Sequence, residues 1–194
     1  MSGKRFRITA LQSRLADLNI DAVILVLSRD LFYYTGTSQP CILLVTPDDY
    51  FLFVRRALPF VLDETWLDPG RIVFPGDFKE VLARLKQAGV EKGRLGLELD
   101  VMPAALYLRL VKSFPGYELV NFSDEVLRQR MQKDLEEIEL IRNAGRVLKK
   151  GHERVLEVLR EGMTELELAA EVEDAHRRAG HEGVFAMRNF DFFM

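Results

Sequence analysis

The residues best suited to metal chemistry in this chain are its three histidines, His152, His176 and His181, and the acidic residues near them. Glu173 and His176 form an E-x-x-H pattern, which places a carboxylate and an imidazole one helical turn apart. Di-iron helical bundles use two copies of this pattern together with further glutamates, whereas this sequence has one copy. A polar helix end, where the helix dipole favours histidine, therefore explains His176 better than a metal site does.

The single cysteine, Cys41, is the candidate thiol nucleophile. It opens an apolar run of strand type, where a buried cysteine behaves as a small hydrophobic residue, so we expect a structural role. The sequence contains no G-x-S-x-G motif and no glycine-rich phosphate loop. No pair of acidic residues is marked as an acid/base couple. The sequence therefore predicts no complete catalytic centre in this chain.

The stretch from Arg29 to Gln39 is the most promising candidate for a binding loop. It follows an apolar run over residues 22–27, and open α/β sheets place binding loops after the carboxyl ends of such strands. Tyr33 and Tyr34 precede Thr35-Gly36-Thr37-Ser38 in this stretch. A structural role, with the tyrosines covering the edge of a sheet, is the first expectation, and a binding role is the alternative.

The elements that would position these residues alternate along the first two thirds of the chain. Apolar residues at helical spacing predict helices over residues 6–18, 78–88 and 103–114, and Ser28 is a plausible cap for a further helical turn. Short apolar runs predict strands over residues 22–27, 41–45, 50–54, 71–76, 94–99 and 117–122. The turn sequence TPDD joins the second and third of these strands as an antiparallel hairpin, while residues 55–66 remain ambiguous. The pattern predicts an α/β fold, a mixed β-sheet with helices on both faces.

A helical segment without strand signals follows this domain. Ser123 is a plausible cap for a short helix ending at Arg130. The capping boxes that begin at Asp134 and Thr164 predict two longer helices, ending near residues 161 and 179. We therefore expect two domains, residues 1–130 and residues 131–194.

The last residues, 183–194, carry four phenylalanines and are predicted to form a strand or its approach. Each buried phenylalanine would contribute about 1.5–3 kcal/mol, so these rings need a partner. The favoured interpretation is that the native polypeptide continues and supplies that partner. The alternative is a tail that packs back on the chain or on another copy.

Composition limits the partners and the location of the protein. There are 27 basic and 30 acidic residues, a net charge of -3, so the chain lacks the positive excess that nucleic acids attract. The N-terminus has no uninterrupted apolar segment of signal-peptide type, and no apolar run approaches the ~20 residues that span a bilayer. One cysteine cannot form a disulfide within the chain, which suits the cytoplasm. We expect a cytoplasmic protein that binds neither nucleic acid nor membrane.

Three sequence motifs occur in an order that is typical of one family. They are DLFYYTGT (residues 30–37), KDLEEIELIRNA (133–144) and GMTELELAAEVE (162–173). In this order and spacing, the chain resembles the N-terminal part of the creatinase/prolidase family, which includes the Xaa-Pro aminopeptidases and Xaa-Pro dipeptidases. The resemblance implies a mixed-sheet N-terminal domain, a joining helix and the first helices of the pita-bread catalytic domain.

The resemblance also implies a reaction that this chain does not complete by itself. Family members bind two divalent metals, usually manganese or cobalt, through two Asp, one His and two Glu, and hydrolyse the peptide bond before proline. None of these ligands can be carried onto this sequence. The N-terminal domain helps to build a homodimer, and its loops reach over the partner's active site. Tyr34, Thr37, Gln39 and Trp66 are the candidates for that substrate-binding rim.

Three functions follow as hypotheses. The first is the N-terminal part of a Xaa-Pro peptidase, inactive on its own, whose full-length form takes proline-containing peptides. The second is a non-catalytic interaction module retained for assembly or peptide binding. The third is part of a creatinase-like amidinohydrolase, because creatinase shares the fold without the peptidase reaction.

Overall fold

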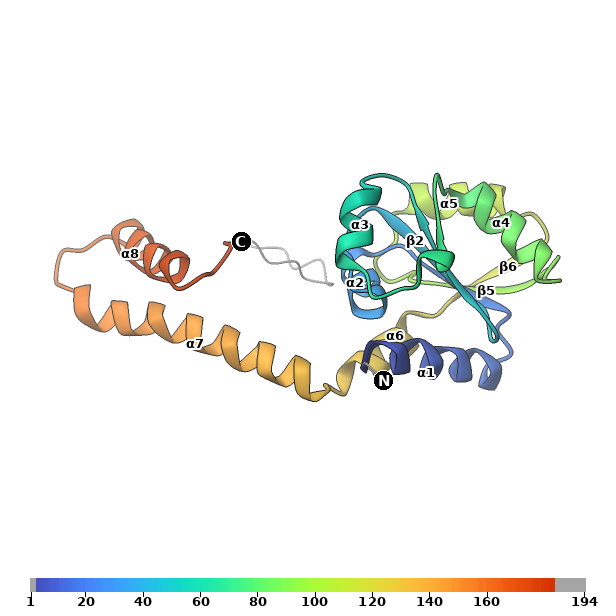
Figure 1. The fold of residues 1–194 in the computed structure, drawn as a ribbon. Coiled ribbons are helices and arrows are strands. Elements are labelled where there is room, and N and C mark those ends of the chain that lie inside the picture. Colours follow the sequence, from blue (N-terminus) through green and yellow to red (C-terminus); the bar gives the residue numbers. More distant parts are fainter. Residues whose placement is uncertain (1–2, 184–194) are drawn as a thin grey trace. The chain divides into compact units, whose positions relative to one another are not determined.

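The computed structural model describes residues 3–183 (Figure 1). Its backbone contacts divide the chain after Gln132 into a first unit, residues 1–132, and a second unit, residues 133–194. The first unit contains α1 (Gly3–Asp17), β1 (Ala22–Leu25), α2 (Ser28–Thr35), β2 (Cys41–Val45), β3 (Tyr50–Val54), α3 (Leu58–Glu64), a short 3-10 helix (Pro69–Arg71), β4 (Ile72–Val73), α4 (Phe78–Gln87), β5 (Gly93–Leu97), α5 (Ala104–Ser113), β6 (Tyr117–Asn121) and α6 (Ser123–Met131). The second unit contains α7 (Leu135–Val158) and α8 (Glu165–Arg178).

The strands of the first unit form one mixed sheet in the order β4-β3-β2-β1-β5-β6. The β2–β3 hairpin is antiparallel and so is the β1–β2 pair, whereas β5 runs parallel to both β1 and β6. Val23 in β1 lies opposite Val45 of β2 on one side and opposite Gly96 of β5 on the other. The pairing therefore changes from antiparallel to parallel at β1, and again at β3, which runs parallel to β4.

Side chains alternate along the strands, so each face of the sheet has its own hydrophobic core. One core combines strand residues with α1, α2, α3 and α6, and includes Leu15, Val23, Tyr34, Leu43, Val61 and Val126. The other combines strand residues with α4 and α5, and includes Ile24, Leu44, Val81, Leu85, Leu95 and Leu110. Each such side chain contributes about 1.5–3 kcal/mol when fully buried. The predicted α/β class, a mixed sheet with helices on both faces, is confirmed, and Figure 1 shows the two helical layers.

The helix predicted over residues 78–88 begins at Phe78, with Asp77 as its N-cap. The Asp77 carboxylate accepts a hydrogen bond from the Lys79 amide at 2.6 Å, and the Glu80 carboxylate accepts one from the Asp77 amide at 2.9 Å. This reciprocal capping box satisfies amide groups that have no partner inside the helix. Val81 and Leu85, one helical turn apart, are fully buried on the inner face of α4.

The two serine caps that the sequence predicts, Ser28 and Ser123, are wrong. Leu27, not Ser28, is the N-cap of α2, and it makes no side-chain cap hydrogen bond. Phe122, not Ser123, is the N-cap of α6. The Ser123 hydroxyl instead donates to the Asn121 side-chain oxygen at 2.6 Å, which ties the helix start to the end of β6.

Two segments differ in length or type from the prediction. The strand expected over residues 71–76 is limited to β4, because Pro69–Arg71 forms a 3-10 helix and Pro75 has no amide for the ladder. The ambiguous residues 55–66 contain α3, whose first turn carries Pro59. Proline is favoured at a helix start, since its missing amide has no partner there in any case.

The second unit is a helical hairpin of α7 and α8. Both predicted capping boxes are present. The Glu137 backbone amide donates to the Asp134 carboxylate at 2.9 Å, and the Glu167 backbone amide donates to the Thr164 hydroxyl at 3.2 Å. An ion pair at 2.7 Å joins Arg154 of α7 to Glu171 of α8. The phenylalanine-rich stretch predicted as a strand, residues 183–194, lies almost entirely outside the described residues.

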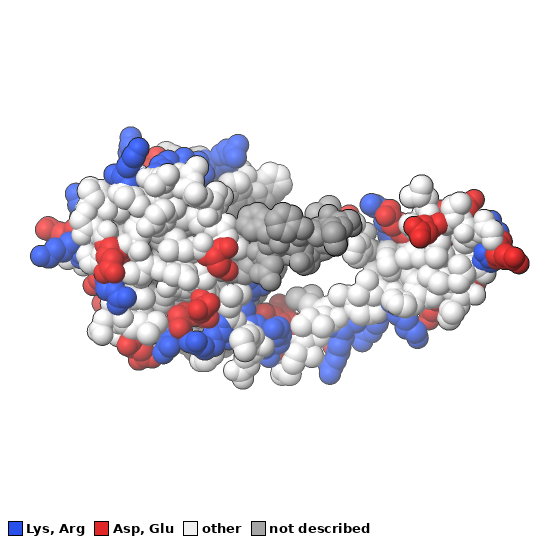
Figure 2. All heavy atoms as spheres, turned by 180° about the vertical axis from the view of Figure 1, so that it is seen from behind, with Lys and Arg blue, Asp and Glu red and all other residues white. Residues whose placement is uncertain are grey.

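The surface carries charges of both signs. On the face shown in Figure 2, acidic and basic side chains are interspersed with uncharged ones, and neither sign covers a continuous area. Within residues 3–183, none of the helices combines the length and the apolar character that crossing a membrane requires.

Candidate functional site

The candidate site is the segment from Tyr34 to Gln39, called the candidate loop, which comprises the last two residues of α2 and the residues that follow the helix. Gly36 ends the helix in the left-handed conformation, with φ +85°, and its amide donates to the Phe32 carbonyl at 2.9 Å. A side chain at this position would also place its Cβ 3.0 Å from the Glu64 carbonyl oxygen. The turn that directs the loop away from α2 therefore requires glycine for two reasons, backbone conformation and close approach to α3.

The Glu64 carboxylate holds two of the four predicted site residues together. The Thr37 hydroxyl donates to Glu64 Oε2 at 2.5 Å, and Gln39 Nε2 donates to Glu64 Oε1 at 3.0 Å. The backbone amide of Gln39 in turn donates to the Thr37 hydroxyl at 3.2 Å. Both Glu64 carboxylate oxygens are thus engaged, and one exposed hydrogen bond orients the Gln39 side chain at the surface.

The other two predicted residues are joined on the opposite side of the loop. Trp66 Nε1 donates to the Tyr34 carbonyl at 3.1 Å, and the Thr65 hydroxyl donates to the Thr35 carbonyl at 2.7 Å. These carbonyls belong to the last turn of α2, where carbonyls lack amide partners within the helix. The Thr35 carbonyl also accepts from the Trp66 backbone amide at 3.3 Å. The half-buried Trp66 ring also lies 6.5 Å from the Tyr50 ring, measured between centroids.

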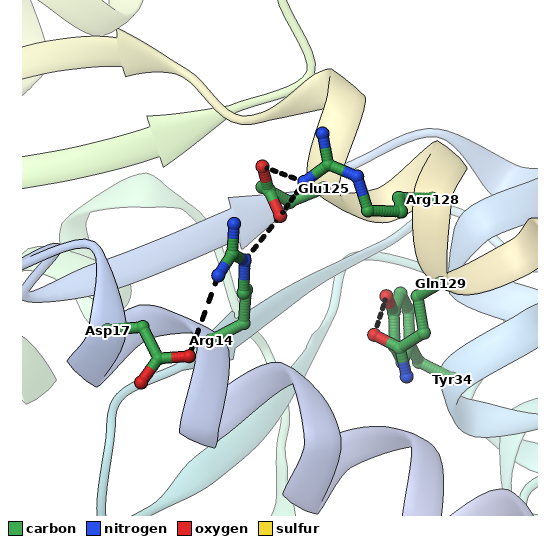
Figure 3. Close-up of polar contacts among 6 residues, drawn as sticks. All are labelled: Arg14, Asp17, Tyr34, Glu125, Arg128 and Gln129. Atoms are coloured by element: carbon green, nitrogen blue, oxygen red, sulfur yellow. Dashed lines mark hydrogen bonds and ion pairs between the residues drawn. The ribbon is translucent and has the colours of Figure 1, made fainter.

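Tyr34 is directed away from the loop surface. Its side chain is 0% exposed, and its hydroxyl donates to Gln129 Oε1 of α6 at 3.0 Å (Figure 3). Burial raises the pKa of this phenol, so it stays protonated. Thr37 is buried as well. Of the four candidates, Gln39 and Trp66 are partly exposed, whereas Tyr34 and Thr37 support them from inside.

Helix α6 is fixed to α1 beside Tyr34 by a second polar group of residues. Glu125 accepts hydrogen bonds from Arg14 of α1 at 2.5 Å and from Arg128 at 2.7 Å (Figure 3). The hydrogen bond from Arg14 is the main cause that lowers the pKa of the Glu125 carboxyl. Gln129 also donates to the Arg7 carbonyl at 2.7 Å. The region under the candidate loop is therefore held by polar contacts from α1 and α6.

Sequence reasoning missed Glu64. The residue lies at the end of α3, within the segment that showed neither helical nor strand spacing. A usable signal was present, because Pro59 marks a helix start and the acidic pair Asp63-Glu64 directly precedes Thr65 and Trp66. That signal could locate the helix, but it could not show that Glu64 reaches Thr37, 27 positions away in sequence.

Cys41 lies at the start of β2, near this carboxylate. The side chain is buried, and burial followed by the negative charge of Glu64 raises the pKa of its thiol to about 11. A neutral thiol is a poor nucleophile. These properties are those of a core residue.

The dinuclear metal centre that the resemblance implies does not fit the described part of the chain. Within residues 3–183, no three His, Cys, Asp or Glu side chains are grouped so that they could hold a metal ion. His176, from the E-x-x-H pattern, instead packs against Gly151 of α7, with its Nε2 3.3 Å from the Leu148 carbonyl oxygen. No metal-dependent step can be assigned to these residues.

Comparison with known proteins agrees with the two-part organisation. The family model of the Creatinase/Prolidase N-terminal domain matches residues 7–132, and that of Metallopeptidase family M24 matches residues 139–193. Creatinase from Bacillus sp. (strain B-0618) is 33% identical over 175 residues, which are 84% of this chain and 42% of creatinase.

Solved structures match over nearly the whole chain. The Xaa-Pro dipeptidase from Bacillus anthracis superimposes with a TM-score of 0.82 at 22% identity, over 92% of this chain and 50% of that one. The X-Pro aminopeptidase from Thermotoga maritima MSB8 gives a TM-score of 0.71 at 25% identity, over 91% of this chain and 50% of that one. The chain thus spans about half the length of the relatives it matches. The N-terminal family model covers most of the sequence, and the chain belongs to the creatinase/prolidase family.

Proposed function

We propose that this chain supplies the N-terminal domain of a metal-dependent hydrolase and borders an active site that it does not itself contain. The observation that carries the proposal is the match of residues 7–132 to the family's N-terminal domain, in a chain half as long as its relatives. The two divalent metals, manganese or cobalt, would be held by the part of such a protein that corresponds to the other half of those relatives.

The loop from Tyr34 to Gln39 is the proposed border of that active site. Gln39 and Trp66 offer a side-chain amide and an indole ring at the surface. Glu64 accepts from the Gln39 side chain, and Thr37 in turn donates to Glu64. A rigid polar group of this kind can orient a substrate at little entropic cost. We propose that two copies of the full-length protein form a homodimer, in which the loop of one copy reaches the site of the other. A cytoplasmic location is proposed from the single cysteine.

The proposed substrate is a proline-containing dipeptide. Several of the matched structures are named as prolidases or Xaa-Pro dipeptidases, among them those from Bacillus anthracis and Pyrococcus furiosus. A second candidate is a creatinase-like reaction, because creatinase from Bacillus sp. (strain B-0618) is 33% identical over 84% of this chain. Both candidates require the full-length protein.

A substrate comparison separates the candidates. The gene product that includes the coding sequence past Met194 is assayed with Mn²⁺ on an Xaa-Pro dipeptide and on creatine, the substrate that the name creatinase implies. Hydrolysis of the dipeptide supports the first candidate, and hydrolysis of creatine alone supports the second. A stop codon directly after residue 194, with neither activity, would instead favour a non-catalytic interaction module.

A further inference from the structure

Two buried carboxyl groups, those of Asp30 and Glu98, come together at the opposite end of α2 from Gly36. Asp30 is 0% exposed and Glu98 is 1% exposed. Asp30 lies in the first turn of α2, after β1, and Glu98 directly follows β5. Because β1 and β5 are parallel neighbours, the segments after their carboxyl ends meet at one edge of the sheet. Two ionised carboxylates in such a place would be costly, since both lose their hydration.

The contacts of Glu98 leave one of its oxygens without a donor. Its Oε2 accepts hydrogen bonds from the Val26 amide at 2.9 Å and from the Leu27 amide at 3.1 Å. Its Oε1 is buried, and within residues 3–183 no N–H or O–H group donates to it. Asp30, whose carboxylate accepts from Arg130 of α6, lies within hydrogen-bonding reach of Glu98. A proton on Oε1 would convert the unsatisfied acceptor into a donor to Asp30.

We propose that Asp30 and Glu98 share one proton in the folded protein, and that this proton helps to hold α2, β5 and the last turn of α6 together. With the proton in place, Asp30 carries the negative charge that pairs with Arg130. Without it, two carboxylates repel each other in a site closed to water. Since α6 is the last element of the first unit, the pair is a pH-sensitive support for the segment that leads into the second unit.

The groups that face this pair come from three elements. Arg130 of α6 is the cation in contact with Asp30. Tyr34 of α2 lies near both carboxyls, and burial raises the pKa of its phenol. The Tyr33 ring packs edge-on against Tyr34, with the ring centroids 4.9 Å apart. Arg7 of α1 stacks on the Tyr33 ring, with its guanidinium carbon 4.1 Å from the ring centroid. The guanidinium of Arg130 lies 5.8 Å from the same ring.

The electrostatic environment agrees with this geometry and sets the direction of the pH effect. Burial, and next the hydrogen bond to Asp30, raise the pKa of Glu98 from 4.5 to about 8. Below pH 4.5 the carboxyl is protonated in both the folded and the unfolded chain. Between about pH 4.5 and pH 8 the unfolded chain releases the proton and the folded chain keeps it, so stability falls as pH rises. Above about pH 8 the Glu98 carboxyl has lost its proton in both the folded and the unfolded chain, so its effect on the free energy of unfolding no longer changes with pH.

The test compares the unmodified chain with Glu98→Gln, whose amide oxygen can still accept from Val26 and Leu27. Urea unfolding is followed between pH 5 and pH 9 by the fluorescence of Trp66, the single tryptophan, which reports on the first unit. The unfolding equilibrium constant of the unmodified chain, divided by that of E98Q, is expected to rise up to about tenfold per pH unit below pH 8. The matched control is Glu125→Gln, a glutamate held by arginines, for which this ratio does not rise with pH.

A second measurement on the unmodified chain keeps the test decisive if E98Q does not fold. The NMR shifts of the Val26 and Leu27 amides, which donate to Glu98, are expected to titrate together with an inflection near pH 8. The proposal is overturned if these shifts show no inflection between pH 5 and pH 9. It is equally overturned if the stability ratio between the unmodified chain and E98Q is independent of pH.

Discussion

At the scale of single residues, the candidate loop depends on a hydroxyl group that is hidden from solvent. Thr37 is buried, donates to Glu64 and accepts from the Gln39 amide. Thr37→Val keeps the shape but leaves that amide without its acceptor, so we expect the free energy of unfolding to fall by about 1–3 kcal/mol. Chemical denaturation measures the change. Ser38→Ala, at the exposed neighbouring position, serves as the control and should stay within about 0.5 kcal/mol.

The thiol of Cys41 provides a second test at this scale. Because burial and Glu64 raise its pKa to about 11, little thiolate exists at pH 7.5. We expect a disulfide reagent such as Ellman's reagent to label the native chain at least ~100-fold more slowly than the chain unfolded in denaturant, where the pKa is about 8.5. A native rate within tenfold of the unfolded rate would show that the side chain is neither buried nor perturbed.

At the scale of elements, patterns with a local cause were predictable and contacts between distant segments were not. The hairpin of residues 41–45 and 50–54 and the capping boxes at Asp134 and Thr164 follow from neighbouring residues, and the structure contains them as predicted. Neither serine side chain caps its helix, and the contacts found at these helix starts include ones between distant segments. Glu98, 71 positions away, accepts the Leu27 amide at the start of α2, and the Ser123 hydroxyl accepts from the Asp100 amide. The carboxylate of Glu64 escaped prediction for the same reason.

Two glycines of α7 offer a matched experiment on the helical hairpin. A Cβ on Gly151 would lie 2.0 Å from Nε2 of His176 on α8, whereas a Cβ on Gly145 meets no atom within 4 Å. Gly145→Ala is expected to stabilise the second unit by roughly 0.5–1 kcal/mol through helix propensity. Gly151→Ala gains the same propensity but displaces the His176 ring, so we expect it to be less stable than G145A by about 1 kcal/mol or more. Equal stabilisation of both variants in thermal unfolding would refute this packing.

At the scale of the whole molecule, the chain covers the N-terminal part of its relatives, about half of their length. The supporting role of the first unit and the chemistry of a longer protein are both proposals. The sequence motifs at residues 30–37, 133–144 and 162–173 were enough to identify the family, because their order is preserved along the chain. The contacts of the proposed border could not be predicted in the same way, because they join positions far apart in sequence, such as Thr37 and Glu64.

The role of the loop can be tested in the longer gene product. Gln39→Ala removes the amide that Glu64 orients, and we expect KM for an Xaa-Pro dipeptide to rise about 3- to 10-fold, the loss of one modest hydrogen bond, while kcat stays within about twofold. Ser38→Ala is the control and should leave both parameters unchanged. A fall in kcat at unchanged KM would place Gln39 in the reaction itself, and no change in either would remove the loop from the site.

The most direct test of the central claim compares the hydrolysis of an Xaa-Pro dipeptide by the chain of residues 1–194 and by the gene product extended past Met194, both with Mn²⁺. The claim that this chain borders a metal site without containing it predicts turnover by the extended product, loss of that turnover on chelation of the metal, and no turnover by residues 1–194 alone. Metal-dependent hydrolysis of the dipeptide by residues 1–194 alone would contradict it.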